Sequence, residues 1–270
     1  MEFGICLNVV DVLRESPSIL EEQLAVIAAA GFSYVEINVT SYAGASDAEI
    51  NTIMETLIKS NISAKRACVL FPGDLKVVGP KKNDNTIRDY LGNILPKLKA
   101  IGVEIIVFGS GGARSIPDGF PYSEAFSQFC DTARLTASMA AESNIKVALE
   151  HLNPGECNLL ITVEETIKAV REVNLPNCGL LFDFYHIDEG TDDILNVLKA
   201  KDILIHSHVA QPGSRLYPVP ESSESLQTYF TILKDADYKG AVSVEATLNS
   251  EKSFEENMTD AYKVLIENLI

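Results

Sequence analysis

The sequence predicts an α/β fold, a single (β/α)8 barrel in which residues 1–270 form one domain. Eight short apolar runs, rich in Val and Ile, alternate with helical segments along the whole chain. Nearly unbroken apolarity is typical of parallel strands that are buried on both faces. The chain also has no low-complexity stretch and no linker-like change of composition. Eight alternating units in 270 residues suit a closed barrel better than an open doubly wound sheet.

The strands are expected, in chain order, at about 3–8, 33–38, 64–70, 103–108, 146–150, 179–183, 203–208 and 241–245. Several of these runs begin shortly after a Gly or Asn that ends a helical segment, namely Gly31, Asn61, Gly102, Asn144 and Gly240. Gly and Asn tolerate the left-handed conformation that closes a helix. These residues therefore mark the boundaries between helix and strand.

The helices between the strands show start signals and apolar stripes. Thr162 with Glu165, and Ser253 with Glu256, have the spacing of a capping box. An apolar helical stripe follows each of these two capping boxes. Val163, Ile167 and Val170 form the first stripe, and the second consists of Phe254, Met258, Ala261, Leu265 and Leu269. No GxGxxG follows the first strand, and GSGG at 109–112 lacks the third spaced glycine, so the dinucleotide-binding signal is weak.

Charge and hydropathy argue against two kinds of partner. The formal net charge is −16 and no basic run is present, which disfavours binding to nucleic acid phosphates. No run of about 18 apolar residues exists, so no membrane span is expected. The N-terminal apolar stretch lacks a preceding basic region, and we interpret it as the first strand. The five scattered cysteines are read as small core residues, and their pattern favours a reducing cytoplasm.

Four consecutive predicted strands, the fifth to the eighth, end on side chains that can bind a metal: Glu150, Asp183, His208 and Glu245. In a barrel, the carboxyl ends of the strands form the rim where catalytic residues gather. A charge after an apolar run is costly to bury unless it is paired or bound to a metal. An oxygen-rich set with one imidazole favours Mn, Mg or Co, with Zn as an alternative. The sequence therefore predicts one divalent metal ion at this rim.

Three segments around these residues carry a family pattern. ALEHLNPGECN contains Glu150 and Glu156, LLFDFYHIDEG contains Asp183 and His186, and IHSHVAQPGSRLYP contains His208 and Arg215. Together with the final VSVE they resemble the xylose isomerase-like TIM barrels, and within them the ketose 3-epimerases related to tagatose and psicose epimerases. The spacing from His208 to Arg215 is one residue longer than in that family, and the chain has no Trp for the indole wall of its pocket.

The resemblance implies a metal-dependent sugar isomerase or epimerase with a small carbohydrate substrate. In such enzymes Glu150 and Glu245 would lie on opposite faces of the reacting carbon, as the acid and base of an enediolate mechanism. Glu156, His186 and Arg215 match the residues that bind substrate oxygens. Arg114, in GSGGAR, either contacts an acidic or phosphorylated substrate or braces its loop. By analogy the protein would be a homo-oligomer, a dimer or tetramer, and the cysteine pattern predicts a cytoplasmic location.

Other polar residues near the predicted rim could have a structural role instead of a role in binding or catalysis. His206 lies two residues before His208 on the same strand face, and we expect it to support the site from a deeper layer rather than to bind the metal. His151 should point away from the ligand face. Glu36, in the second strand, either hydrogen-bonds substrate or Arg114, or braces a loop. The acidic residues 188–190 are expected to open the sixth helix.

Three further functions are compatible with the same barrel. An inosose dehydratase-like lyase shares the proton abstraction but expels a hydroxyl. An endonuclease IV-like DNA repair enzyme is disfavoured, because it needs a trinuclear zinc site whereas the chain has only four histidines and a net charge of −16. A non-catalytic sugar-binding barrel is disfavoured as well, because a pure binder does not need paired carboxylate bases.

Overall fold

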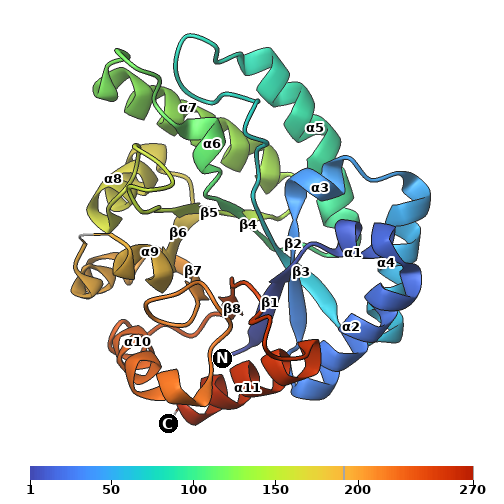
Figure 1. Cartoon of the computed structure of the whole chain (residues 1–270). Helices are drawn as coiled ribbons and strands as arrows, with labels where there is room; N and C mark the ends of the chain where they lie inside the picture. The colour runs from blue at the N-terminus through green and yellow to red at the C-terminus, as the bar shows by residue number, and fades with distance from the viewer. Residues whose placement is uncertain (191, 270) are drawn as a thin grey trace.

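The computed structural model describes residues 1–190 and 192–269, and it confirms the predicted (β/α)8 barrel. Eight parallel strands follow one another in chain order around a closed barrel (Figure 1). They are β1 Phe3–Leu7, β2 Tyr34–Asn38, β3 Ser63–Cys68, β4 Ile105–Phe108, β5 Lys146–Glu150, β6 Cys178–Asp183, β7 Leu204–Val209 and β8 Val242–Val244. The last pairing, between β8 and β1, closes the sheet and leaves no free edge among these strands.

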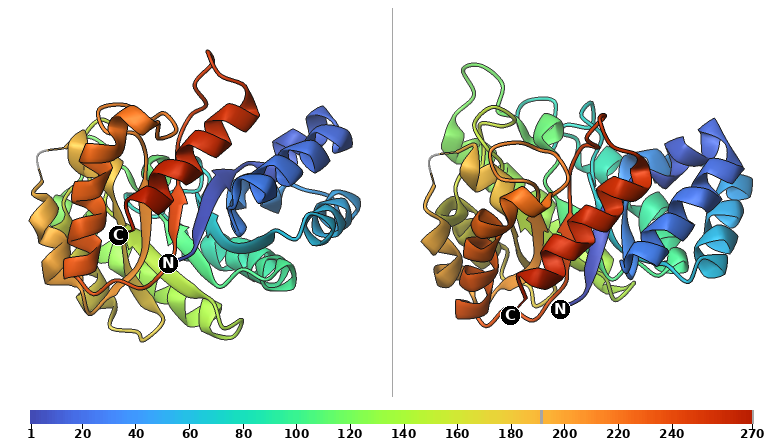
Figure 2. Two further views of the ribbon diagram at one scale, coloured as in Figure 1. Left: turned by 90° about the horizontal axis from the view of Figure 1, so that it is seen from below. Right: turned by 60° about the horizontal axis from the view of Figure 1, so that its bottom comes forward.

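The long helices lie outside the barrel and cover its outer face, as Figures 1 and 2 show. The α-helices are α1 Val9–Glu15, α2 Pro17–Ala30, α3 Val39–Ala43, α4 Asp47–Lys59, α5 Asp84–Ile101, α6 Gly111–Arg114, α7 Tyr122–Ala141, α8 Val163–Val173, α9 Phe184–Asp188, α10 Ser223–Asp235 and α11 Phe254–Glu267. Two 3-10 helices, η1 Ile194–Ala200 and η2 Pro220–Ser222, complete the described elements. None of these helices combines the length and apolarity needed to cross a membrane.

The predicted helix ends are confirmed at four of the five positions. Gly31 and Gly102 end α2 and α5 at φ values of 115° and 96°. Asn61 and Asn144 also adopt the left-handed conformation, at φ 54° and 58°. The expectation for Gly240 is wrong, because α10 ends at Asp235 and the left-handed residue there is Asp237, at φ 55°.

The helix starts agree with their sequence signals in most cases. Ser253 and Glu256 form the predicted capping box at α11. Thr162 accepts from the amide of Glu165 at α8, but the Glu165 carboxylate accepts from Ile161 rather than from the cap residue. The expectation for residues 188–190 is wrong, because α9 begins directly after Asp183 and these residues end it.

Apolar side chains pack on both faces of the barrel strands and form two separate cores. The larger one fills the space between the strands and the helices. A small one lies inside the barrel and consists of Cys68, Ile105, Val107, Ala148 and Leu181. Inward-facing side chains alternate with outward-facing ones along each strand. The barrel interior also contains buried polar side chains at the same level as this apolar group, because Leu181 pairs with His206 and Cys6 pairs with Glu36.

Candidate metal and catalytic site

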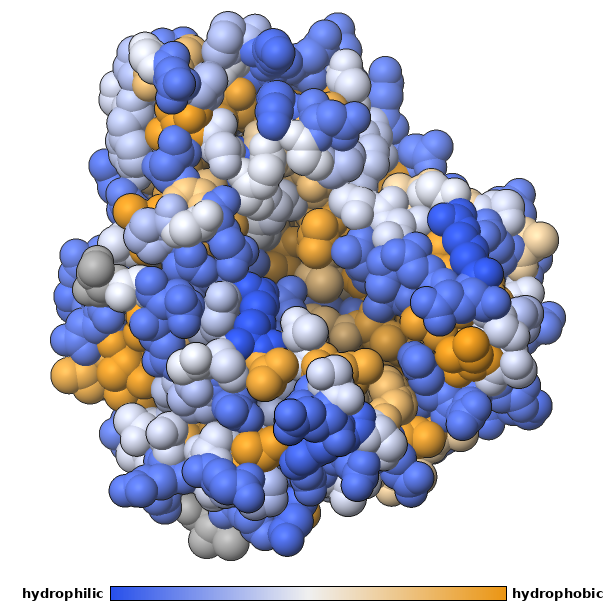
Figure 3. Space-filling model, in the orientation of Figure 1, coloured by the Kyte–Doolittle hydropathy of each residue, from blue (hydrophilic) through white to orange (hydrophobic). Residues whose placement is uncertain are grey.

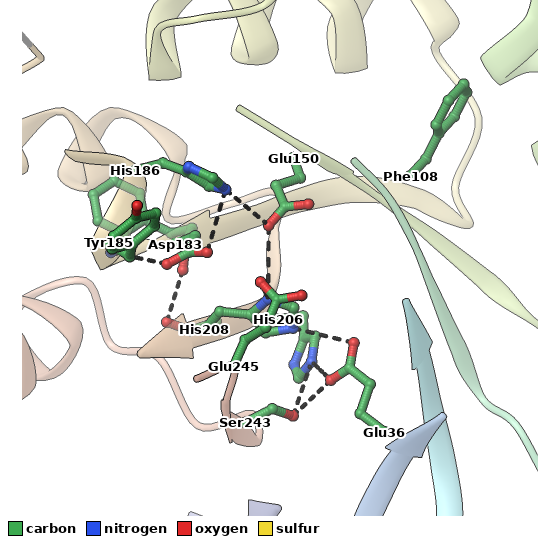
Figure 4. A network of polar contacts seen from close by, with 12 residues as sticks. Glu36, Phe108, Glu150, Asp183, Tyr185, His186, His206, His208, Ser243 and Glu245 are labelled. Atoms are coloured by element: carbon green, nitrogen blue, oxygen red, sulfur yellow. Dashed lines mark hydrogen bonds and ion pairs between the residues drawn. The ribbon is translucent and has the colours of Figure 1, made fainter. Parts of the chain in front are cut away.

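The structure brings the four predicted metal ligands together. Glu150 and Asp183 end β5 and β6, His208 lies near the end of β7, and Glu245 directly follows β8. Glu245 keeps its place because its amide donates to the Val209 carbonyl at 3.1 Å. One ligand atom from each of the four residues lies within 4.8 Å of all the others. Figure 4 shows these side chains converging on one point above the barrel interior.

The unpaired atoms of this cluster fit a divalent cation. Glu150 Oε1, Asp183 Oδ2 and His208 Nδ1 are buried and have no hydrogen-bond partner among the described residues. His208 Nδ1 lies 3.6 Å from Glu150 Oε1 and 3.5 Å from Glu245 Oε2. Buried acceptors that point at a common centre without a donor are costly unless a cation occupies that centre. The available donors are three carboxylates and one imidazole.

The pKa values of the three carboxylates in the cluster are shifted in different directions. Burial raises the pKa of Asp183 to about 8, and the nearby Glu150 and Glu245 carboxylates add to this effect. Burial and Glu245 likewise raise the pKa of Glu150. Burial would also raise the pKa of Glu245, but hydrogen bonding to His208 and the charges of His208 and Arg215 lower it to about 2. The three carboxylates thus repel one another when ionised, and a cation between them relieves that repulsion.

A buried network below the cluster holds the metal-facing histidine. Glu36 is fully buried, and its Oε1 accepts from His208 Nε2 at 3.1 Å. Its Oε2 accepts from His206 Nε2 at 2.8 Å and from Ser243 Oγ at 2.6 Å. Because Nε2 of His208 is engaged as a donor, Nδ1 is the nitrogen that can bind a metal. The sequence missed this role of Glu36.

The two other histidine predictions agree with the structure. His206 lies one layer deeper than His208, with its Nδ1 3.2 Å from the Ala241 carbonyl, and it contacts Glu36 rather than facing the four candidate ligands. His151 is buried outside the cluster, where its ring lies 5.3 Å from that of Phe182. Burial lowers its pKa to about 4, so it is a neutral core residue at ordinary pH. The expectation that Glu36 contacts substrate or Arg114 does not agree with its position.

A cavity of about 250 Å³ opens directly above the four-residue cluster. It is lined by Cys68, Val69, Ser110, Gly111, Glu150, Leu152, Glu156, His186, Arg215 and Glu245. Figure 3 shows the hollow in the centre of this face of the molecule. A larger hollow of about 810 Å³ lies beside α9 and η1 and contains none of the predicted site residues. We therefore assign the chemistry to the smaller cavity.

Arg215 points into this cavity despite the longer loop. Its guanidinium donates to Glu156 Oε1 at 3.0 Å and also to Glu245 Oε2. The same group lies over the Tyr185 ring, 4.4 Å from its centroid. Arg215 therefore joins Glu156 and Glu245 across the mouth of the cavity, where the resemblance placed a substrate-binding group.

His186 also faces the cavity, and a neighbour fixes its tautomer. Its Nδ1 accepts from the backbone amide of Asn153 at 3.3 Å and lies 3.0 Å from the Asn153 side-chain nitrogen. The proton consequently resides on Nε2, which lies 3.5 Å from Asp183 Oδ2 and 4.0 Å from Glu150 Oε1. Burial lowers the pKa of His186 to about 2, so the ring is a neutral donor. Sequence reasoning did not single out Asn153, although it lies between Glu150 and Glu156.

Arg114 is a predicted site residue that does not line the cavity. Its side chain is fully buried. The guanidinium donates to the carbonyl oxygens of Phe108, Glu150 and Leu160, at 3.4, 2.7 and 3.4 Å. The expectation that it contacts substrate is therefore wrong, and the alternative, that it braces a loop, agrees with these bonds. Arg114 ties the end of β4 to the end of β5.

The comparisons with known proteins place the chain in a family. The sequence profile of the xylose isomerase-like TIM barrel family matches residues 24–266. The chain therefore belongs to the xylose isomerase-like TIM barrel family.

Individual relatives cover part of the chain. An L-ribulose 3-epimerase of Methylomonas sp. is 32% identical over 111 residues, which are 41% of this chain and 38% of that protein. The 3-dehydro-D-guloside 4-epimerase of Escherichia coli is 27% identical over 127 residues, 45% of this chain and 46% of that protein. The chain thus spans less than half the length of these curated relatives in sequence alignments. A crystal structure of D-allulose 3-epimerase from Methylomonas sp. aligns with a TM-score of 0.84 at 22% identity, covering 100% of this chain and 98% of that one, which shows the shared fold.

Proposed function

We propose that the protein is a divalent-metal-dependent sugar epimerase or isomerase that moves a proton next to a carbonyl. The observation that supports this proposal is the arrangement of Glu150 and Glu245, whose carboxylates approach His208 Nδ1 separately, at 3.6 and 3.5 Å, on the floor of the cavity. The names of the relatives, L-ribulose 3-epimerase and 3-dehydro-D-guloside 4-epimerase, support the same reaction class.

In the proposed reaction the two glutamates exchange a proton with opposite faces of one carbon. One carboxylate removes the proton from the carbon next to the carbonyl, and the other returns a proton to the opposite face, so that the centre inverts. The neutral His186 and the charged Arg215 hold the sugar hydroxyls at the mouth of the cavity. Glu156 orients Arg215 through the contact at 3.0 Å.

Glu150, Asp183, His208 and Glu245 would hold the divalent ion. When bound, it supplies positive charge next to the substrate oxygen on which negative charge develops as the proton leaves. Mn, Mg or Co suit the oxygen-rich ligand set, and Zn is the alternative. The cavity of about 250 Å³ suits a small carbohydrate.

The proposal is tested by replacing each glutamate with glutamine, which removes the carboxylate base but keeps the size of the side chain. Glu150→Gln and Glu245→Gln should each lower kcat by about 10²- to 10⁴-fold, the usual loss for a general acid or base. The measurement is epimerisation of a panel of ketopentoses and ketohexoses with added Mn²⁺, and deuterium uptake from D₂O at the reacting carbon. Glu142→Gln, an exposed position at the end of α7, is the matched control and should keep its rate.

Three outcomes contradict this proposal. Full activity in both variants would exclude the glutamates as bases. A product lighter by one water would identify the lyase instead. A sugar that binds without any deuterium uptake, across the whole panel, would favour the non-catalytic barrel.

A further inference from the structure

Two thiols that are far apart in the sequence lie inside the barrel beside Glu245. Cys6 is on β1 and Cys68 is the last residue of β3. Their sulfur atoms and a carboxylate oxygen of Glu245 all lie within 4.8 Å of one another. Cys68 is 5% exposed and lines the cavity, and Cys6 packs against the same small core inside the barrel.

This geometry does not suit a disulfide. Cys6 is aligned with Glu36 on β2, and Cys68 is aligned with Asn38 on the same strand, so the two cysteines lie on strands separated by β2. Two strand spacings separate their Cα atoms by roughly 9 Å across the sheet, and the offset from Glu36 to Asn38 adds a further separation along the strands. The sum exceeds the limit of about 7 Å at which a disulfide closes without backbone movement. Oxidation to a disulfide would therefore require the barrel wall to deform.

The same geometry suits a metal ion. Zinc binds thiolate sulfur at about 2.3 Å and carboxylate oxygen at about 2.0–2.2 Å, so that tetrahedral ligand atoms lie about 3.3–3.8 Å apart. That spacing falls within the 4.8 Å that the three ligand atoms already satisfy. Two sulfurs and one oxygen form a soft ligand set, unlike the oxygen-rich cluster beside it.

We propose that Cys6, Cys68 and Glu245 form a second metal site, which takes a thiophilic divalent ion such as zinc or cadmium. As the two metal–sulfur bonds form, each thiol releases its proton to solvent, and no oxidant or reductant takes part. Glu245 belongs to both ligand sets. An ion at the thiol site therefore draws Glu245 away from its proposed role as acid or base, and inhibits the enzyme. This consequence for activity rests on the proposed function, but the binding itself does not.

Binding is tested with cadmium and without any substrate. The unsubstituted protein is first saturated with Mg²⁺ and then titrated with Cd²⁺, while the ultraviolet sulfur-to-cadmium charge-transfer absorption is followed. We expect a band that saturates at one equivalent, and a fall in Cd²⁺ affinity of at least about tenfold in Cys6→Ala, Cys6→Ser and Cys68→Ala. Cys130→Ala, a buried position on α7, is the matched control and should bind like the parent protein.

The absence of a band in the parent protein would overturn the site, as would an unchanged affinity in a folded Cys6→Ser variant or an equal loss in Cys130→Ala. The Cys6→Ser variant keeps the side-chain volume, and its circular dichroism melting curve establishes that it is folded.

A second measurement concerns inhibition. Each protein's epimerase rate is followed as Cd²⁺ is added and is compared with its own uninhibited rate. Half-inhibition should need at least about tenfold more Cd²⁺ in Cys6→Ser than in the parent. Equal sensitivity would contradict the link between this site and Glu245. If the parent protein shows the cadmium band but epimerises no sugar, the thiol site is supported and the proposed function is contradicted.

Discussion

At the scale of single residues, the site depends on a side chain that is buried beneath the candidate ligands. Glu36 engages Nε2 of His208, which leaves Nδ1 to face the other three ligands. Burial would raise the pKa of Glu36, but the charges of His208 and His206 outweigh it and hold the pKa well below its usual range. The carboxylate is therefore ionised, and an ionised partner fixes the ring orientation and increases the basicity of the ligand nitrogen.

Replacing this partner should weaken metal binding. Glu36→Gln keeps the size of the side chain but removes its charge, so we expect the affinity for Mn²⁺ to fall about 10- to 100-fold. Isothermal titration calorimetry on metal-free protein measures this change. Glu142→Gln removes an exposed carboxylate and serves as the control. An unchanged affinity in Glu36→Gln would show that His208 is held without its partner.

At the scale of elements, the loops after β4 and β5 pack against each other to shape the cavity. Arg114 bonds the Phe108 and Glu150 carbonyls and so couples the two strand ends. The glycines of GSGG allow the close approach that this coupling needs. A Cβ at Gly109 would lie 2.0 Å from Glu150 Oε2, and one at Gly111 would lie 2.9 Å from the Glu156 carbonyl oxygen. The motif that resembled a weak dinucleotide signal thus makes room for a site carboxylate.

The steric role of Gly109 leads to a matched pair of variants. Gly109→Ala should displace the Glu150 carboxylate and lower kcat about 100-fold, the typical cost of misplacing a catalytic group by about 1 Å. Gly92→Ala, in the exposed part of α5 where a Cβ meets nothing within 4 Å, should leave kcat unchanged and stabilise the helix by about 0.5–1 kcal/mol. Steady-state kinetics and thermal melting of both variants test this contrast. Equal kinetics would contradict it.

At the scale of the whole molecule, closure of the barrel brings several buried carboxylates close together, and folding must overcome their mutual repulsion. Asp183 has its pKa raised to about 8 by burial and by its carboxylate neighbours. The pKa of Glu150 is raised for the same reasons. Burial would lower the pKa of His208, but Glu36, Glu150 and Glu245 raise it well above its usual value. In the metal-free protein these three groups hold protons more tightly when folded than when unfolded.

The sign of the resulting pH dependence follows from that difference. Above about pH 6.5, the ordinary pKa of a His, Asp183 and His208 still hold protons in the folded state that the unfolded chain has released, so metal-free stability should fall as the pH rises towards 8. Below that pH the lowered pKa values of His151 and His186 act in the opposite direction. Glu245, with its pKa lowered to about 2, contributes only below this window. A metal ion replaces the protons, so the gain in Tm on adding Mn²⁺ should be larger at pH 8 than at pH 6.

Differential scanning calorimetry with and without Mn²⁺ at both pH values measures this effect. Asp183→Asn removes the group with the pKa of about 8 and should flatten the pH dependence of the metal-free Tm. The same gain in Tm at pH 6 and pH 8 for the unsubstituted protein would contradict the proposed linkage.

The sequence alone determined the barrel and the positions of its four candidate ligands. A buried strand that ends on a charged residue places that residue at the carboxyl rim, whatever the neighbouring strands contain. This local rule located Glu150, Asp183 and His208 correctly, and it located Glu245 although β8 ends one residue earlier. The family pattern added Glu156, His186 and Arg215, which the structure places around the same cavity.

Only the tertiary structure decided which other polar residues serve that rim. Whether Arg114 reaches the pocket depends on how two loops pack, and its three carbonyl acceptors come from residues up to 46 positions away. The hydrogen bond between Glu36 and His208 joins residues that are 172 positions apart. The proximity of the Cys6 and Cys68 sulfur atoms depends on how far along its strand each cysteine lies in the closed sheet. Such contacts are set by strand register and by barrel closure, which are properties of the assembled sheet rather than of any segment of it.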